Sequence, residues 1–176
     1  MTHITLAVTG SISAYKAADI TSQLTKLGFE VKVLMTPSAQ KFITPLTLQV
    51  LSKNPVGLEV MVEDDPQRIE HIDIGKETDL FLVAPASANT IAKLAMGLAD
   101  NMVTSTALAL PQRTKKLLAP AMNTKMLDHP ATQRNLKLLQ DYGYQIIQPR
   151  EATLACGDQG LATVDTIIQA VKENCL

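Results

Sequence analysis

The chain has 176 residues, with 16 Lys and Arg against 17 Asp and Glu, so its formal net charge at pH 7 is −1. This balance excludes the strongly basic surface that proteins use to bind nucleic acid or an anionic membrane. Aromatic residues make up only 3% of the chain and Trp is absent, which argues against a platform for stacking bases.

The chain carries no sign of a membrane or secretory segment. No apolar run approaches the roughly 20 residues that a membrane-spanning helix needs. The run at residues 4–8 is too short for a signal peptide and has no basic residues before it. Cys156 and Cys175 do not make a disulfide framework, so we expect a reducing, cytoplasmic location.

Short runs of β-forming residues alternate with helical patterns, which is typical of parallel βαβ units. The sequence predicts strands over residues 4–8, 31–35, 57–61, 80–84, 117–120 and 145–148. Helices are predicted from Ser13 to a stop at Gly28, over 130–143 and over 164–174. The polar stretch 62–79 is expected to be a surface excursion.

The order of these elements predicts a single α/β domain over residues 1–176. Its core would be a doubly wound, mostly parallel sheet of the Rossmann-like or flavodoxin-like kind, with helices on both faces. Segments 44–52 and 104–111 carry more exposed-looking apolar residues than one core needs. Part of this surface is therefore expected to be buried between subunits.

Small hydrogen-bonding residues follow four of the predicted strands, at 10–13, 36–38, 85–90 and 120–123, and none of these segments contains a charge. Each segment alone is explained by helix capping, because Ser, Thr and Asn are the favoured caps. The carboxyl ends of the strands meet at one crevice, where hydroxyls and the N–H groups of helix N-termini can hold an anion. The four together favour a ligand that carries phosphate.

The identity of this ligand is narrowed by what the strand ends lack. No G-x-G-x-x-G follows the first strand, and G-x-x-x-x-G-K-[ST] does not occur. The second strand ends in Leu34-Met35-Thr36, without the acidic residue that would hold the ribose of NAD. A mononucleotide such as FMN fits these ends better than a dinucleotide or a nucleoside triphosphate.

Several segments appear in a characteristic order: Gly10 to Lys16, His71-Ile72, PASANT at 85–90, PAMNTKM at 120–126 and LACG at 154–157. Together they resemble the homo-oligomeric flavin-containing cysteine decarboxylase family, and the resemblance runs end to end. It is closest to the branch that acts on 4'-phosphopantothenoylcysteine in coenzyme A biosynthesis.

The resemblance implies an FMN-dependent enzyme assembled as trimers or as a dodecamer of trimers, with the active site at a subunit boundary. Many bacterial relatives also carry a fused ligase domain, for which this chain has no room, so a separate phosphopantothenate–cysteine ligase is expected. The implied cofactor contacts are Gly10, Ser11, Ile12, Ser38, Ser87, Ala88, Asn89 and Thr90.

The resemblance also implies a reaction: flavin oxidation of the substrate's thiol, loss of CO2, and re-reduction of the ene-thiol. His71 would act as acid and base, although a lone His in a polar stretch can also simply be exposed to solvent. Asn123 would hold the substrate carboxylate or amide, with capping of the following turn as the alternative. Met126 would shape the same pocket, with core packing as the alternative.

Cys156, with Ala155 and Gly157 around it, would bind substrate and serve as the final proton donor. An unperturbed thiol has a pKa of about 8.5 and is mostly protonated at neutral pH, which suits a donor better than a nucleophile. The neighbouring glycines would let its loop close over the substrate. Cys175 has no expected role, and three scattered histidines do not indicate a metal site.

Lys16, Lys125 and Arg150 are the candidates for binding the substrate phosphate. Two positions depart from the family pattern and bear on substrate selectivity. Leu127 stands where an aromatic residue is common, and Leu161-Ala162-Thr163 stands where a second glycine-rich step is common.

Three alternative functions share this fold. A peptide-cysteine oxidative decarboxylase stops at the ene-thiol and would not need Cys156 as a proton donor. A flavin prenyltransferase typically has a Pro-Cys-Ser-Met loop in place of residues 85–90. A non-catalytic flavin-binding regulatory subunit tends to lack one of His71, Asn123 and Cys156, all of which are present here.

Overall fold

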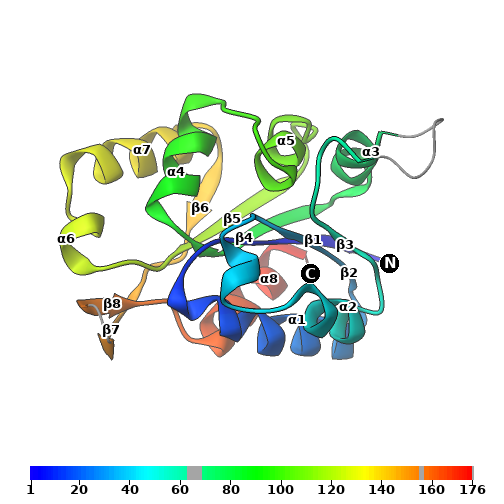
Figure 1. Cartoon of the computed structure of the whole chain (residues 1–176), viewed down its shortest axis with the longest axis horizontal. Helices are drawn as coiled ribbons and strands as arrows, with labels where there is room; N and C mark the ends of the chain where they lie inside the picture. The colour runs from blue at the N-terminus through cyan, green and yellow to red at the C-terminus, as the bar shows by residue number, and fades with distance from the viewer. Residues whose placement is uncertain (63–68, 155–156, 176) are drawn as a thin grey trace.

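The computed structural model describes residues 1–62, 69–154 and 157–175, with the backbone alone for 151–154 and 157–159. Within these residues, six strands form one sheet in the order β3-β2-β1-β4-β5-β6, and every neighbouring pair is parallel (Figure 1). The predicted doubly wound sheet is therefore confirmed. The strands are His3–Val8 (β1), Glu30–Met35 (β2), Val56–Gly57 (β3), Leu80–Ala86 (β4), Lys115–Pro120 (β5) and Tyr144–Ile146 (β6).

Helices cover both faces of this sheet (Figure 1). One face carries α1 (Ala17–Lys26), α2 (Pro45–Ser52) and α8 (Val164–Cys175), and the other carries α3 (Glu70–Glu77), α4 (Ala88–Met96), α5 (Met102–Leu108) and α7 (Pro130–Asp141). Shorter turns are η1 (Ile12–Lys16), η2 (Ala39–Lys41) and α6 (Thr124–Leu127). No helix in the described part of the chain is long and apolar enough to cross a membrane.

Two apolar cores form because successive side chains of a strand point to opposite faces of the sheet. In β1, Leu6 and Val8 join the core on the side of α1 and α8, whereas Ala7 joins the core on the side of α4 and α7. In β4, Leu82 and Phe81 divide in the same way. Strands that are apolar on both faces are typical of a parallel sheet covered on both sides.

Most of the predicted elements are confirmed, with their ends moved by one or two residues. The first helical segment ends where Gly28 takes a φ of +87°, a left-handed conformation that glycine adopts without a steric penalty. Pro130 opens α7, as expected, since the first helical position does not need the N–H that proline lacks.

Two predictions are wrong. Of the predicted strand over residues 57–61, only Gly57 pairs with β2, as the second residue of the two-residue strand β3. The stretch 62–79 is more than a surface excursion, because α3 forms within it and buries Ile74 and Gly75. Charged residues fill the exposed side of this short helix, and they mask its one buried face in the sequence. The pattern also does not indicate the antiparallel hairpin of β7 (Arg150–Leu154) and β8 (Gly157–Gly160).

Candidate active site

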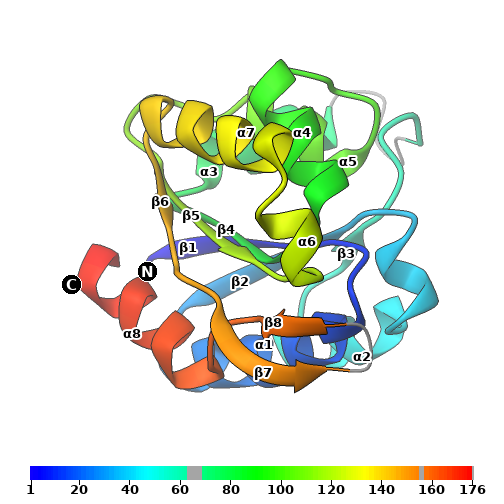
Figure 2. The same cartoon turned by 90° about the vertical axis from the view of Figure 1, so that its left-hand side faces the viewer.

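The order of the strands reverses between β1 and β4, because the chain winds outward from β1 to β3 and then from β4 to β6 in the other direction. Ligands of open α/β sheets bind beyond the carboxyl ends of the strands at such a point. A cavity of about 350 Å³ lies there, and its walls include Gly10 after β1, residues 36–38 after β2 and residues 87–90 after β4. Figure 2 views the molecule from this end, with α6 and the β7–β8 hairpin toward the viewer.

The buried Thr9 hydroxyl joins the loops that follow β1 and β4. Its Oγ1 donates to the Pro85 carbonyl oxygen at 2.7 Å and accepts from the Ser87 N–H at 2.8 Å. The loop after β5 is tied in as well, because the Ala121 N–H donates to the Ala86 carbonyl oxygen at 3.1 Å. These bonds hold the three loops in place beside the cavity without any charged group.

Gly10 and Ser38 approach each other closely in the wall of this cavity. A Cβ on Gly10 would lie 2.5 Å from the Ser38 Cβ, closer than real side chains come. The absence of a side chain at residue 10 therefore allows the β1 and β2 loops to approach each other. A bound group that lies between these loops can contact backbone directly, as phosphate-binding loops require.

The N-terminus of α4 supplies the hydrogen-bond donors. Ser87 caps this helix, because its Oγ accepts from the Thr90 N–H at 3.2 Å. The N–H groups of Ala88 and Asn89 lie in the first turn, where a helix offers no acceptor of its own. Both residues line the cavity, so a phosphate placed there can accept from them and is favoured by the helix dipole.

Six of the eight predicted cofactor contacts line this cavity, and Ser11 and Ile12 do not. The Ser11 hydroxyl accepts from the Ser13 N–H at 3.3 Å and donates to the Ala121 carbonyl oxygen at 3.2 Å, so it caps η1 and ties two loops together. The Ile12 side chain is 54% exposed. Contacts of these two residues with a cofactor stay predictions.

A charged pair at the rim of the cavity was not indicated by the sequence pattern. Lys93 Nζ donates to Asp100 Oδ2 at 2.5 Å, and both residues line the cavity together with Asn101. The hydrogen bond from Lys93 is the main reason why the pKa of Asp100 is lowered. Lys93 lies three residues beyond the last predicted contact, Thr90, so only the turn of α4 would have placed it on the same wall.

The residues after β5 lie next to the cavity. Asn123 is the N-cap of α6, and its Oδ1 accepts from the Lys125 N–H at 2.9 Å, so the capping alternative is realised. Met126 lines the cavity and is 50% exposed, which makes the core-packing alternative wrong. Leu127, which departs from the family pattern, is the buried residue of α6. Leu161 and Ala162, which follow the hairpin and also depart from the pattern, are buried too.

Strand β8, which begins at Gly157 of the LACG segment, packs against α6 (Figure 2). Gly157 begins β8 and pairs with Leu154, so residues 157–160 form a strand and not the open loop that was expected. Two glycines within four residues suggested a loop, yet β7, which ends three residues before β8 begins, is its antiparallel partner. Ala155 and Cys156 lie outside the described residues.

His71 lies in the first turn of α3, half-buried, and is not among the residues that line the cavity. Its Nδ1 is buried and has no hydrogen-bond partner among the residues that the structure describes. The alternative of a simply solvent-exposed imidazole does not describe this side chain, because one of its two nitrogens points into the protein.

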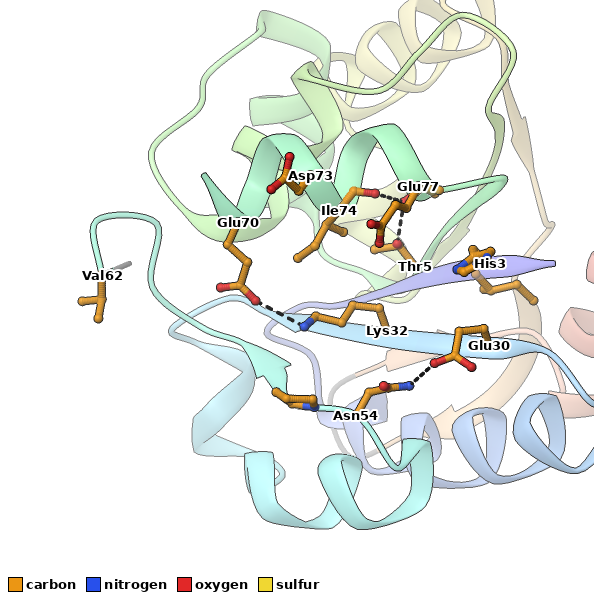
Figure 3. A pocket seen from close by; sticks show the side chains of 13 residues that line it. His3, Thr5, Glu30, Lys32, Asn54, Val62, Glu70, Asp73, Ile74 and Glu77 are labelled. Atoms are coloured by element: carbon orange, nitrogen blue, oxygen red, sulfur yellow. Dashed lines mark hydrogen bonds and ion pairs between the residues drawn. The ribbon is translucent and has the colours of Figure 1, made fainter. Parts of the chain in front are cut away.

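A second cavity, of about 430 Å³, opens beside the amino-terminal halves of β1 and β2 (Figure 3). Lys32 Nζ pairs there with Glu70 Oε1 at 3.2 Å, and the carboxylates of Glu30, Asp73 and Glu77 line the same space. These acidic groups outnumber the single lysine and would repel a phosphate. The smaller cavity at the strand ends is therefore the better candidate for the cofactor site, because the charges of Lys93 and Asp100 in its wall balance each other.

Comparison with known proteins shows the family to which the chain belongs. The family model described as Flavoprotein matches residues 1–176. The chain belongs to the flavoprotein family. This flavoprotein is 64% identical, over 97% of either chain, to a probable phosphopantothenoylcysteine decarboxylase from Streptococcus mutans serotype c. It is 45% identical to the coenzyme A biosynthesis bifunctional protein CoaBC of Bacillus subtilis, with 97% of this chain covered but only 41% of that longer protein.

Solved structures give the same assignment for this flavoprotein. A mutant PPC decarboxylase complexed with pantothenoylaminoethenethiol superposes with a TM-score of 0.89 at 30% identity, over 98% of this chain and 97% of that one. The FMN-dependent cysteine decarboxylase SpaF superposes with a TM-score of 0.87 at 27% identity, over 100% and 98%. The family resemblance read from the sequence is confirmed, and a flavin is the cofactor of this family.

Proposed function

We propose that the chain is an FMN-dependent decarboxylase that converts 4'-phosphopantothenoylcysteine to 4'-phosphopantetheine in coenzyme A biosynthesis. One observation carries the proposal: a cradle of hydroxyl and N–H groups, in whose wall the charges of Lys93 and Asp100 balance, lies at the reversal of strand order. It lies directly beside α6, which has Asn123 as its N-cap and contributes Met126 to the cavity wall. The names of the similar decarboxylases support it.

The cradle fits FMN by its chemistry. The phosphate would bind the N–H groups at the start of α4, between the close loops of Gly10 and Ser38. Ser87 and Thr90 offer hydroxyls to the rest of the cofactor. A volume of about 350 Å³ lies within the range of roughly 300–1,000 Å³ that small-molecule sites occupy.

When bound, FMN would take two electrons from the carbon that bears the substrate thiol and return them at the end of the reaction. The chain's own residues would manage the substrate and its protons. His71 would accept the thiol proton through its imidazole. The Asn123 amide would hold the substrate carboxylate without a positive charge, so that departure of neutral CO2 is not opposed. Cys156 would protonate carbon in the last step.

We place the complete site at a boundary between subunits of a trimer, alone or in a dodecamer of trimers. His71 does not line the cavity within one described chain, whereas Met126 does, so a neighbouring copy would bring its imidazole to this cavity. Leu46 and Val50 on α2 are each 66% exposed, which supports apolar contacts between copies. In this proposal residues 1–176 form one catalytic domain that works in the cytoplasm. A separate ligase would supply the cysteine conjugate on which it acts.

The decisive experiment mixes purified protein, loaded with FMN, with 4'-phosphopantothenoylcysteine. We expect release of CO2 and formation of 4'-phosphopantetheine, measured by mass spectrometry, with neither product from protein stripped of FMN. Protein that cannot be loaded with FMN and yet releases CO2 would overturn the cofactor assignment. Accumulation of the oxidised ene-thiol from the intact protein would instead point to a peptide-cysteine type of reaction.

A further inference from the structure

Two buried polar atoms lack a partner among the side chains that the structure describes: His71 Nδ1 and Thr106 Oγ1. The Thr106 side chain is fully buried, with 0% exposure. A buried polar group without a hydrogen bond costs about 1–3 kcal/mol, so two of them in one small domain need a physical reason.

The two residues belong to neighbouring helices, His71 to α3 and Thr106 to α5. These helices pack against each other and run in the same direction, because each precedes a strand of the parallel sheet. Their contact is closest at Gly75, where a Cβ would come 3.1 Å from the Ala109 carbonyl oxygen. Beyond this point Arg113 Nη2 donates to the Lys76 carbonyl oxygen at 2.7 Å, which helps to fix the register between the two segments.

One helical turn earlier, this register brings His71 and Thr106 to the same level. His71 precedes Gly75 by four residues and Thr106 precedes Ala109 by three, so each lies on the side of its helix that faces the other helix. The other hydroxyls of α5 are already used. Thr104 belongs to the capping box with Asn101, and Ser105 Oγ donates to the Ala99 carbonyl oxygen at 3.3 Å.

The chemistry of the two atoms is complementary. A hydroxyl can donate one hydrogen bond, and a neutral imidazole has one nitrogen that only accepts. If Nδ1 accepts, the ring proton resides on Nε2, the nitrogen on the other side of the ring. A small rotation of either side chain or one buried water would complete the bond, since a buried water typically joins such unsatisfied groups.

We propose that Thr106 is a positioning residue for His71: its hydroxyl donates to Nδ1, directly or through one water, and so sets the Nε2–H tautomer and the orientation of the imidazole. The hydrogen bond itself follows from the packing of α3 against α5. Its consequence for turnover rests on the proposed role of His71 in decarboxylation.

The test compares T106V, which keeps the shape and removes the donor, with T106S, which keeps the donor. Solid-state ¹⁵N NMR of histidine-labelled full-length protein reads the tautomer, and H71N identifies the His71 signals. In the wild type and T106S we expect one tautomer with a protonated Nε2 and a hydrogen-bonded Nδ1. In T106V we expect the Nδ1 signal to lose its hydrogen-bond shift and the tautomers to mix.

In turnover, T106V should lower kcat about three- to tenfold with KM unchanged, and T106S should restore it, since one net hydrogen bond has that effect. T21V is the control: Thr21 is also fully buried in a helix, on the opposite face of the sheet, and should change neither readout. T106V keeps the size and the β-branched shape of the buried side chain, so it should fold. His71 signals that are unchanged in T106V would overturn the proposal, whether or not the protein decarboxylates this substrate.

Discussion

Gly10 and Ser38 stand at the ends of neighbouring strands, so close that a Cβ on Gly10 would come within 2.5 Å of the Ser38 Cβ. Strands β1 and β2 are paired in register up to Val8 and Met35, so the two loops cannot move apart without disturbing the sheet. The cradle for the cofactor therefore depends on a missing side chain as much as on the donors around it.

Gly10→Ala should displace Ser38 and widen the gap between the loops. We expect the bound flavin per subunit, measured by absorbance after desalting, to fall at least tenfold, with a loss of stability of about 1–3 kcal/mol from overpacking. Gly57→Ala is the matched control, because its Cβ would meet the Leu34 Cδ2 at 2.6 Å and neither residue lines the cavity. That variant should lose stability but retain flavin, and equal flavin loss in both would contradict the role of Gly10.

Cys156→Ser removes the proposed acid of the last step and leaves the earlier steps intact. We expect CO2 release to be followed by stalling, with the flavin bleached and an unsaturated or oxidised thiol product found by mass spectrometry. Cys175→Ser should turn over normally, because Cys175 lies in the last turn of α8. Normal formation of the saturated product by the Cys156 variant would remove this thiol from the mechanism.

His71→Asn keeps a polar side chain but removes the imidazole, which is the proposed acid and base. We expect flavin binding to be retained and decarboxylation to fall by about 10²–10⁴, the usual contribution of general acid–base catalysis. His129→Asn serves as the control, because His129 Nδ1 caps α7 by accepting from the Ala131 N–H, and Asn is itself a favoured cap. A rate within twofold of the wild type for the His71 variant would refute its role.

The sequence predicts much of the cradle because its parts lie next to strand ends. Buried apolar strands are recognisable by composition, and in a parallel sheet all their carboxyl ends meet at one edge. Segments 36–38 and 87–90 therefore fall into place once the strands are known. Capping hydroxyls and cofactor-binding hydroxyls occur at the same positions, so the observed cap formed by Ser87 is compatible with its predicted contact with the cofactor.

The sequence does not predict what depends on how helices pack. The Lys93–Asp100 pair joins α4 to the loop that follows it. Whether His71 lies opposite Thr106 depends on the register between α3 and α5. Lys93 and Asp100 are seven residues apart, so their pairing depends on how the chain turns after α4. His71 and Thr106 lie on segments far apart in the chain, for which a local pattern carries no signal. The hairpin of β7 and β8 is missed for a related reason, since glycines at 157 and 160 outweigh the pairing with β7.

Asn123→Asp separates the two roles of this residue. Aspartate is as good an N-cap as asparagine, so α6 should keep its bond to the Lys125 N–H and the unfolding midpoint should change little. A second carboxylate beside the substrate carboxylate should nevertheless abolish most decarboxylation while flavin stays bound. If the variant decarboxylates at a near-normal rate, Asn123 acts only as a cap.

Lys16→Met tests which cations bind the substrate phosphate. Partial burial is the main cause that lowers the pKa of Lys16, and the nearby Arg150 guanidinium lowers it further. A phosphate between these two cations would favour the charged ammonium, so phosphate binding should weaken as the pH rises through the lowered pKa of Lys16.

We expect KM for the phosphorylated substrate to rise about tenfold in the Lys16→Met variant, as for the loss of one charge-assisted hydrogen bond of roughly 1.5 kcal/mol. KM for pantothenoylcysteine, which lacks the phosphate, should not change. Lys26→Met, at the exposed end of α1, is the control. An equal rise of KM for both substrates would mean that Lys16 does not recognise the phosphate.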